Sequence, residues 1–181
     1  MTFANQLTLA RLVAVVPIMA ALYIPFPGHR VVATVIYIAA LLTDYLDGIL
    51  ARRSKEVTNF GKLIDSIADK ALIVTLFFAL VAEGSMLSWV AAAMVVREFA
   101  VTGLRMVALE AGEVIAANNW GKAKMVSQSF AVLILLLFGY TLVGYWAMLV
   151  AMILTLLSGW SYLKDTPKIL AAGAGQSRRK W

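Results

Sequence analysis

The chain has 181 residues, of which 62% are hydrophobic and 14% are charged, and its formal net charge is +6. A soluble domain averages about 25% charged residues, so a water-soluble protein is excluded, because a chain of this length could not cover so much apolar surface. The positive charge is explained by anionic lipid headgroups rather than by nucleic acid. Cysteine is absent, which rules out a disulfide framework and leaves the redox compartment open.

Apolar segments long enough to cross a bilayer, which takes about 20 residues, follow one another along the chain. Turn signals such as PFPGHR, EGS and FGYTLVG separate them. The first segment does not have the pattern of a cleavable signal peptide, because Arg11 lies inside it and no small-residue cleavage site follows. The sequence therefore predicts an all-α integral membrane protein with six transmembrane helices, at residues 7–25, 31–51, 62–82, 86–108, 122–142 and 144–163.

Lysine and arginine are concentrated in alternate connections of this predicted bundle. The second connection, the fourth connection and the C-terminal segment are basic, whereas the first offers only His29 and Arg30. Because positive loops are retained on the cytoplasmic side, both termini are predicted to be cytoplasmic. We expect one transmembrane domain over residues 1–170, followed by a basic flexible tail over residues 171–181.

Four carboxylates lie where the second predicted helix ends and the third begins. Asp44 and Asp47 are three residues apart, and Asp65 and Asp69 are four apart, so each pair occupies one face of its helix. An antiparallel hairpin would bring the two pairs together at the cytoplasmic end. Such a cluster favours a hard divalent cation, Mg²⁺ or Mn²⁺, and two such ions would suit a clamp on a pyrophosphate.

The alternative is that these acids cap helices or form salt bridges with Arg52 and Lys62. Acids inside a membrane are energetically costly and are usually functional, and four at these spacings favour the metal site.

The joint spacing resembles a known family. The pattern Asp44-x2-Asp47-Gly48-x2-Ala51-Arg52-x8-Gly61-x3-Asp65-x3-Asp69 matches every fixed position in the signature of the CDP-alcohol phosphatidyltransferases. These membrane enzymes move a phosphatidyl or similar group from a CDP-linked donor to an alcohol. The resemblance implies a six-helix fold over the whole chain, two divalent cations per active site and a homodimer.

The resemblance also implies roles for single residues. Asp44, Asp47 and Asp65 are expected to be the chief metal ligands, and Asp69 is expected to complete the site and act as general base. The residues expected to border the CDP donor are Gly48, Ala51, Arg52 and Gly61, together with Asn5 and Thr8 of an Asn-x2-Thr element at the start of the first helix. That last element could equally be an interfacial helix N-cap.

Basic residues in the second half of the chain suggest a site for an acceptor that carries its own phosphate. Arg97 and Arg105 are eight residues apart, so both lie on one face of the fourth helix, and Lys122 and Lys124 begin the fifth helix on the same side of the membrane. Arginine and lysine bind phosphate oxygens strongly, so these four residues predict an anion pocket beside the metal site. Alternatively, Arg97 pairs with Glu98 or with an Asp of the cluster, and the two lysines only follow the positive-inside rule.

The segment of residues 97–128 resembles the corresponding region of the bacterial phosphatidylglycerolphosphate synthases, a branch of the same family that uses sn-glycerol 3-phosphate as acceptor. It departs from them at Met125, where threonine is common. The implied reaction transfers the phosphatidyl group of CDP-diacylglycerol to glycerol 3-phosphate at the bacterial inner membrane. Inositol phosphate, serine or phosphatidylglycerol as acceptor, a prenyltransferase, and an ion or proton transporter are the alternatives.

Overall fold

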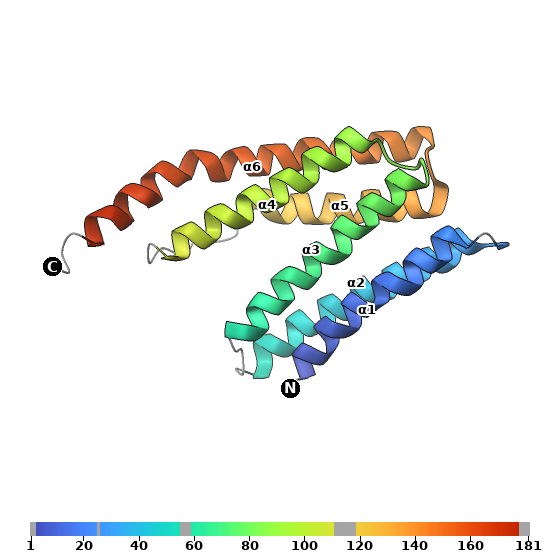
Figure 1. The fold of residues 1–181 in the computed structure, drawn as a ribbon, viewed down its shortest axis with the longest axis horizontal. Coiled ribbons are helices and arrows are strands. Elements are labelled where there is room, and N and C mark those ends of the chain that lie inside the picture. The colour runs from blue at the N-terminus through green and yellow to red at the C-terminus, as the bar shows by residue number, and fades with distance from the viewer. Residues whose placement is uncertain (1–2, 25, 55–58, 111–118, 178–181) are drawn as a thin grey trace. The chain divides into compact units, whose positions relative to one another are not determined.

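A computed structural model describes residues 3–24, 26–54, 59–110 and 119–177 of the chain, with side chains over 13–24, 26–43, 70–108 and 119–164. The all-α prediction is confirmed, because all the regular structure in these residues is helical (Figure 1). The helices in chain order are α1 (Phe3–Tyr23), α2 (His29–Ser54), α3 (Asn59–Ala82), α4 (Ser88–Glu110), α5 (Asn119–Phe138) and α6 (Leu142–Ser177).

Three tight turns lie where the sequence predicts them. Gly28, Gly84 and Gly139 have positive φ angles of 80°, 74° and 67°, in the left-handed region that glycine adopts without steric cost. The Gly139 amide donates to the Leu135 carbonyl at 2.9 Å, which closes the last turn of α5. Helix α5 therefore ends at Phe138, four residues before the predicted end of the fifth segment at residue 142.

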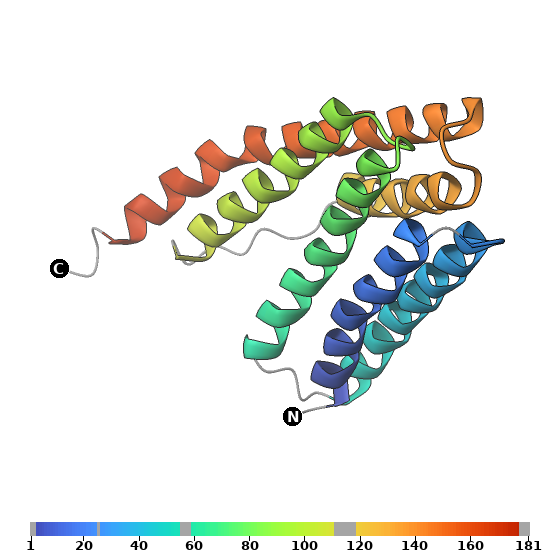
Figure 2. The ribbon, with the colours of Figure 1, turned by 45° about the vertical axis from the view of Figure 1, so that its right-hand side comes forward.

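The chain divides into two compact units, Met1–Ser88 with Val132–Gly144, and Trp89–Ala131 with Tyr145–Trp181. In the first unit, α1 packs against both α2 and α3. Helices α2 and α3 run in opposite directions in Figures 1 and 2, as expected of a helical hairpin. The core of this unit is apolar and includes the buried side chains of Ile18, Tyr37, Leu76, Phe77 and Leu80.

A polar cluster joins the tight turns of the first unit. The guanidinium of Arg30 lies 2.5 Å from Glu83 and donates to the Ser85 hydroxyl and to the Leu135 carbonyl, each at 3.3 Å. The Ser85 hydroxyl in turn donates to Glu83 at 3.3 Å. A β-carbon added at Gly139 would lie 2.8 Å from the Arg30 guanidinium, so this turn needs glycine for space as well as for its φ angle. We call this group the Arg30 cluster.

The second unit contains α4, the first part of α5 and most of α6. Helices α4 and α6 lie side by side in both views (Figures 1 and 2). Its buried apolar residues include Val90, Met94 and Met148. In its described residues it also buries five polar or charged side chains, those of Arg97, Glu98, Gln128, Thr155 and Ser158, whereas the first unit buries the uncharged Thr34 and Ser85.

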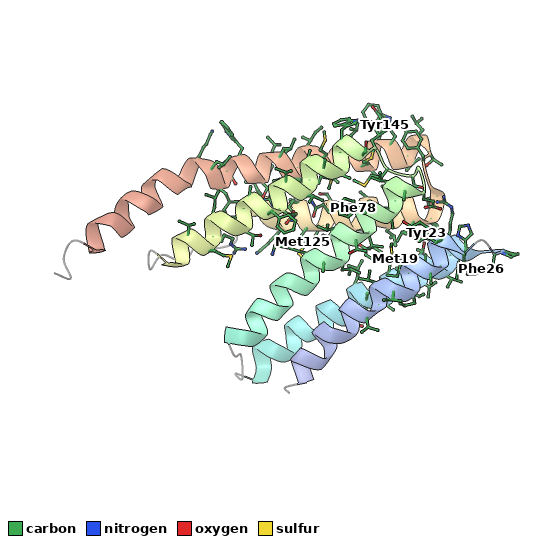
Figure 3. All side chains as sticks on the ribbon, in the orientation of Figure 1. Met19, Tyr23, Phe26, Phe78, Met125 and Tyr145 are labelled. Carbon is green, nitrogen blue, oxygen red and sulfur yellow. The ribbon has the colours of Figure 1, made fainter. Side chains whose placement is uncertain are left out.

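Large apolar side chains face outward from the helices, including Phe78 of α3 and Met125 of α5, which Figure 3 labels. Exposed apolar surface on this scale is typical of a protein surrounded by lipid. Two helical segments in the described part of the chain, Asn119–Phe138 and Leu142–Lys164, are long and apolar enough to cross a bilayer. Only 28% and 33% of their residues are buried within the protein, unlike the core helix of a soluble domain.

Helix α6 is longer than the predicted sixth segment, which ends at residue 163. It continues to Ser177 and so includes the first part of the segment expected to be a flexible tail. Alanines at positions 171, 172 and 174 favour this continuation, because alanine has the highest helix propensity.

Candidate active site

The residues of the predicted metal site lie on two helices of the first unit. Asp44 and Asp47 belong to α2, and Asp65 and Asp69 belong to α3. Because both segments are helical, the spacings of three and four residues place each pair on one face of its helix. The side chains of these four residues lie outside the described part of the structure, so the metal site itself stays a prediction.

The predicted donor-binding positions lie at one end of the first unit. The C-terminal end of α2, the start of α3 and the start of α1 lie at the same end of the first unit in Figures 1 and 2. The same end thus holds all the predicted donor-binding positions, which are Asn5 and Thr8 of α1, Gly48, Ala51 and Arg52 of α2 and Gly61 of α3. The four aspartates would supply carboxylate oxygen atoms, which are the ligands that Mg²⁺ and Mn²⁺ prefer.

A buried ionic cluster organises the second unit around Glu98 of α4. The Glu98 Oε1 atom accepts from the Arg97 guanidinium at 3.3 Å and forms a short contact with the Lys124 ammonium of α5. The side-chain amide of Gln128, one turn further along α5, donates to the same oxygen at 3.4 Å. The side chains of Arg97 and Glu98 are each 8% exposed, so the ion pair lies inside the protein.

Helix α6 completes this cluster with two hydroxyl groups. The Arg97 guanidinium donates to the Ser158 hydroxyl at 2.7 Å, and the Gln128 amide donates to the Thr155 hydroxyl at 3.0 Å. The Thr155 hydroxyl donates to the Ala151 carbonyl at 2.6 Å, which fixes its direction. The Glu98 cluster, defined as Arg97, Glu98, Lys124, Gln128, Thr155 and Ser158, thus connects α4, α5 and α6.

The position of Arg97 depends on a close approach of α6. A β-carbon added at Gly159 would lie 3.0 Å from the Arg97 Cγ and 3.3 Å from its Nε. The guanidinium also lies 6.0 Å from the centre of the Tyr162 ring, within the range of a cation–π interaction. The Arg97 Nε is buried and has no hydrogen-bond partner among the described residues.

An apolar groove of about 550 Å³ runs between α4 and α6 beside Arg97, and Gly159 and Trp160 also line it. Its remaining lining is aliphatic. A groove of this character suits the hydrocarbon part of a lipid rather than a polar substrate.

The four predicted acceptor-binding cations do not all lie in the Glu98 cluster. Arg97 and Lys124 form ion pairs with Glu98, as the alternative interpretation of Arg97 proposed, whereas Arg105 and Lys122 have exposed side chains. Lys122 lines a second apolar groove, of about 610 Å³, between α5 and α6. Residues two apart on a helix point to opposite sides, which explains why Lys122 and Lys124 separate. Met125, where this sequence departs from similar synthases, is 49% exposed.

The sequence analysis missed the uncharged members of the Glu98 cluster and the central role of Glu98. Gln128, Thr155 and Ser158 are polar residues inside apolar segments, and Thr155 and Ser158 are three residues apart on one face of α6. Polar side chains in such segments usually hydrogen-bond to a neighbouring helix, so this spacing could have identified them.

Comparisons with known proteins agree with the residue pattern. The sequence profile of the CDP-alcohol phosphatidyltransferases matches residues 1–157. The chain is 39% identical to a CDP-diacylglycerol–glycerol-3-phosphate 3-phosphatidyltransferase of Bacillus subtilis, over 87% of this chain and 91% of the relative. It is 33% identical to the enzyme of the same name from Rickettsia bellii, over 91% of this chain and 94% of the relative.

A probable phosphatidylglycerophosphate synthase of Mycobacterium tuberculosis is 41% identical over 71% of this chain and 63% of the relative. The profile match extends over both the aspartate-bearing helices of the first unit and most of the Glu98 cluster. The chain therefore belongs to the CDP-alcohol phosphatidyltransferase family.

Proposed function

We propose that this protein transfers the phosphatidyl group of CDP-diacylglycerol to sn-glycerol 3-phosphate, which yields phosphatidylglycerol phosphate and CMP. The names of the relatives from B. subtilis and R. bellii state this donor and this acceptor, and both align with most of the chain. The structural observation that supports a phosphorylated acceptor is the Glu98 cluster, in which two cations share one carboxylate.

The donor half of the site is proposed to lie at the end of the first unit where α2 and α3 meet. Mg²⁺ or Mn²⁺ would be held there by Asp44, Asp47, Asp65 and Asp69. The CDP group would be bordered by Gly48, Ala51, Arg52, Gly61, Asn5 and Thr8. When bound, two such ions neutralise charge on the pyrophosphate and on the departing CMP. The small residues leave the backbone of α2 and α3 open to the nucleotide.

The acceptor half is proposed to lie in the second unit. Arg97 and Lys124 attract the phosphate of glycerol 3-phosphate, and Arg105 and Lys122 add positive charge at the surface. The free primary hydroxyl then attacks the phosphorus that bears diacylglycerol. A new phosphorus–oxygen bond forms as the bond to CMP breaks, and Asp69 accepts the proton of the hydroxyl.

The proposed setting is the bacterial inner membrane, with all six helices crossing the bilayer, both termini in the cytoplasm and the site facing the cytoplasm. The outward-facing apolar residues support it, as do the basic second and fourth connections. Helix α4 contains Arg97, Glu98 and Arg105, which lower its hydropathy, and the ion pair of the first two allows it to lie in lipid. A homodimer is proposed from the family resemblance alone.

The test is release of labelled CMP from CDP-diacylglycerol by the purified protein, with and without Mg²⁺ or Mn²⁺. We expect release to require both the metal and glycerol 3-phosphate. Release that depends instead on inositol phosphate, serine or phosphatidylglycerol would retain the family and replace the acceptor. A protein that releases no CMP with any acceptor would contradict the proposal and leave a prenyltransferase or a transporter as the alternatives.

Asp69→Asn tests the proposed general base. Asparagine has nearly the same shape but cannot take up the proton, so we expect turnover to fall by about a hundredfold or more. Binding of CDP-diacylglycerol should stay partly intact, because the other three aspartates remain as metal ligands. Initial rates of CMP release and equilibrium binding of labelled donor are the measurements. A variant with ordinary turnover would remove Asp69 from this role.

A further inference from the structure

Glu98 is the point at which the polar contacts of the second unit converge. Its Oε1 atom accepts from Arg97, Lys124 and Gln128, which come from two helices. Glu98 is 6% exposed, so these contacts are shielded from solvent. A carboxylate in this position determines where both cationic groups point.

Two cations of the Glu98 cluster converge on one carboxylate. Arg97 and Lys124 both contact the Glu98 Oε1 atom. Arginine and lysine side chains bind phosphate oxygens strongly, so groups brought together in this way suit an anionic ligand. Under the proposed function this ligand is the acceptor phosphate.

Orientation matters most for Lys124. A lysine ammonium sits on a flexible four-carbon stem, so it loses much conformational freedom when it binds a phosphate. The bond to Glu98 restricts the ammonium before the substrate arrives, and the Lys124 side chain is 13% exposed, so it still reaches the surface. Arg97 is restricted in the same way, by Glu98 and by Ser158 of α6. Binding groups that are already ordered bind more tightly, because less entropy is lost.

We propose that Glu98 is a positioning residue for the acceptor: it holds the Lys124 ammonium and the Arg97 guanidinium in the directions that bind the phosphate of glycerol 3-phosphate. This role rests on the proposed function. In this role an acidic residue improves the binding of an anionic substrate, because it orients the two cations that contact the phosphate.

This role can be tested by whether the KM for glycerol 3-phosphate rises or falls when Glu98 loses its charge. If Glu98 only balances charge, its neutralisation removes a repulsion and the KM for glycerol 3-phosphate falls. If Glu98 positions the two cations, the same change releases them and the KM rises. Glu98→Gln keeps the size of the side chain and an oxygen that can accept hydrogen bonds, so it removes the charge with little change in volume.

The experiment uses the full chain in mixed micelles of detergent and CDP-diacylglycerol, and it measures CMP release as each substrate is varied in turn. For Glu98→Gln we expect the KM for glycerol 3-phosphate to rise about tenfold or more, with the KM for the donor nearly unchanged. We also expect the stabilisation of the protein by glycerol 3-phosphate, seen as a shift in Tm, to be lost at concentrations that stabilise the wild type. An unchanged or lower KM for glycerol 3-phosphate would overturn the proposal.

Glu83→Gln is the matched control, because Glu83 is also an acid paired with an arginine but belongs to the Arg30 cluster. We expect both KM values of this variant to remain close to those of the wild type. A rise in the KM for glycerol 3-phosphate equal to that of Glu98→Gln would show a general effect of losing an ion pair and would contradict a positioning role.

Glu98→Asp provides a decision if Glu98→Gln does not fold. It keeps the charge but shortens the side chain by one methylene. A positioning role predicts a higher KM for glycerol 3-phosphate, whereas a role in charge balance alone predicts an unchanged KM. A KM equal to that of the wild type would overturn the proposal.

Lys124→Ala separates failure of this inference from failure of the proposed function. If Lys124→Ala raises the KM for glycerol 3-phosphate and Glu98→Gln does not, only the positioning role fails. If the wild type releases no CMP in response to glycerol 3-phosphate, the proposed function fails, and the positioning role fails with it. In the Lys124→Ala background, Glu98→Gln should raise the KM by a smaller factor than in the wild type. An equal factor would show that Glu98 does not act through Lys124.

Discussion

The Arg30 cluster of the first unit and the Glu98 cluster of the second are built from similar parts and differ in burial and in the number of cations that contact the glutamate. Each contains an arginine held by a glutamate and a serine hydroxyl, and in each a glycine leaves space for the arginine. In the first, one cation meets one anion, and the side chains of Arg30 and Glu83 are 30% and 16% exposed. In the second, two cations meet one anion in a more buried position.

The ion pair of the Arg30 cluster connects turns of the chain, whereas that of the Glu98 cluster orients groups that can bind a ligand. A balanced and partly hydrated pair contributes little beyond local order. A buried carboxylate that holds an arginine and a lysine brings together groups that bind phosphate oxygens. Changes of equivalent residues in the two clusters should therefore affect the KM for glycerol 3-phosphate to different extents.

The largest effect is expected from Arg97→Met. The change keeps an apolar stem but leaves Glu98 with Lys124 as its remaining ion-pair partner in the described structure, so kcat/KM for glycerol 3-phosphate should fall about a hundredfold or more. The free energy of unfolding should fall by about 1–3 kcal/mol, because the buried hydrogen bonds of Arg97 with Glu98 and Ser158 are lost. Steady-state CMP release and thermal unfolding in detergent measure the two effects.

The matched variant is Arg30→Met, for which we expect a smaller loss of Tm and an almost unchanged KM for glycerol 3-phosphate. If Arg30→Met affected that KM as much as Arg97→Met did, the two clusters would not differ in function.

Gly159→Ala should change the activity less than Arg97→Met does, and it should leave the stability nearly unchanged. The added methyl group would lie 3.0 Å from the Arg97 Cγ, so the guanidinium must shift, and we expect the KM for glycerol 3-phosphate to rise about three- to tenfold. The Tm should change little, because alanine favours the helical state by about 1 kcal/mol over glycine and so offsets the close contact. A strongly lowered Tm with an unchanged KM would indicate that Gly159 serves packing only.

Gly139→Ala should have the smallest effect on activity. A non-glycine residue at a φ angle of 67° costs about 1–2 kcal/mol, and the new β-carbon would lie 2.8 Å from the Arg30 guanidinium. We expect the Tm to fall by several degrees while both KM values stay near those of the wild type. A raised KM for glycerol 3-phosphate would instead connect the Arg30 cluster to the acceptor.

Much of the fold could be predicted from hydropathy and turn residues. The six apolar segments correspond to six helices, and three of the predicted connections contain Gly28, Gly84 and Gly139 in the left-handed conformation. The ends were less predictable. Helix α5 ends at Phe138 because Gly139 closes it, whereas α6 continues to Ser177 although its last part contains Pro167, Gly173 and Gly175, which disfavour a helix.

The candidate site could be predicted only in part, because charge and spacing do not say which side chains meet. The aspartate pattern of α2 and α3 is local, so the spacing alone assigns each pair to one helical face. The Glu98 cluster depends on contacts between three helices, such as that of Gln128 with Thr155 across 27 positions. The predicted anion pocket contained both Lys122 and Lys124, but side chains two residues apart on a helix point to opposite sides.

The tight turn at Gly139 has a practical consequence for experiments that add a reporter to this protein. The Thr141 hydroxyl accepts from the Gly144 amide at 3.2 Å and caps the start of α6, and a β-carbon at Gly144 would lie 2.7 Å from the Gly139 carbonyl. An epitope or fluorescent domain inserted between Gly139 and Gly144 would break this cap and pull Arg30 away from the Leu135 carbonyl. Labelling that leaves the enzyme intact is therefore better done by a small thiol-reactive probe on a single introduced cysteine, for example at Leu142, which is 75% exposed, because the chain has no cysteine of its own.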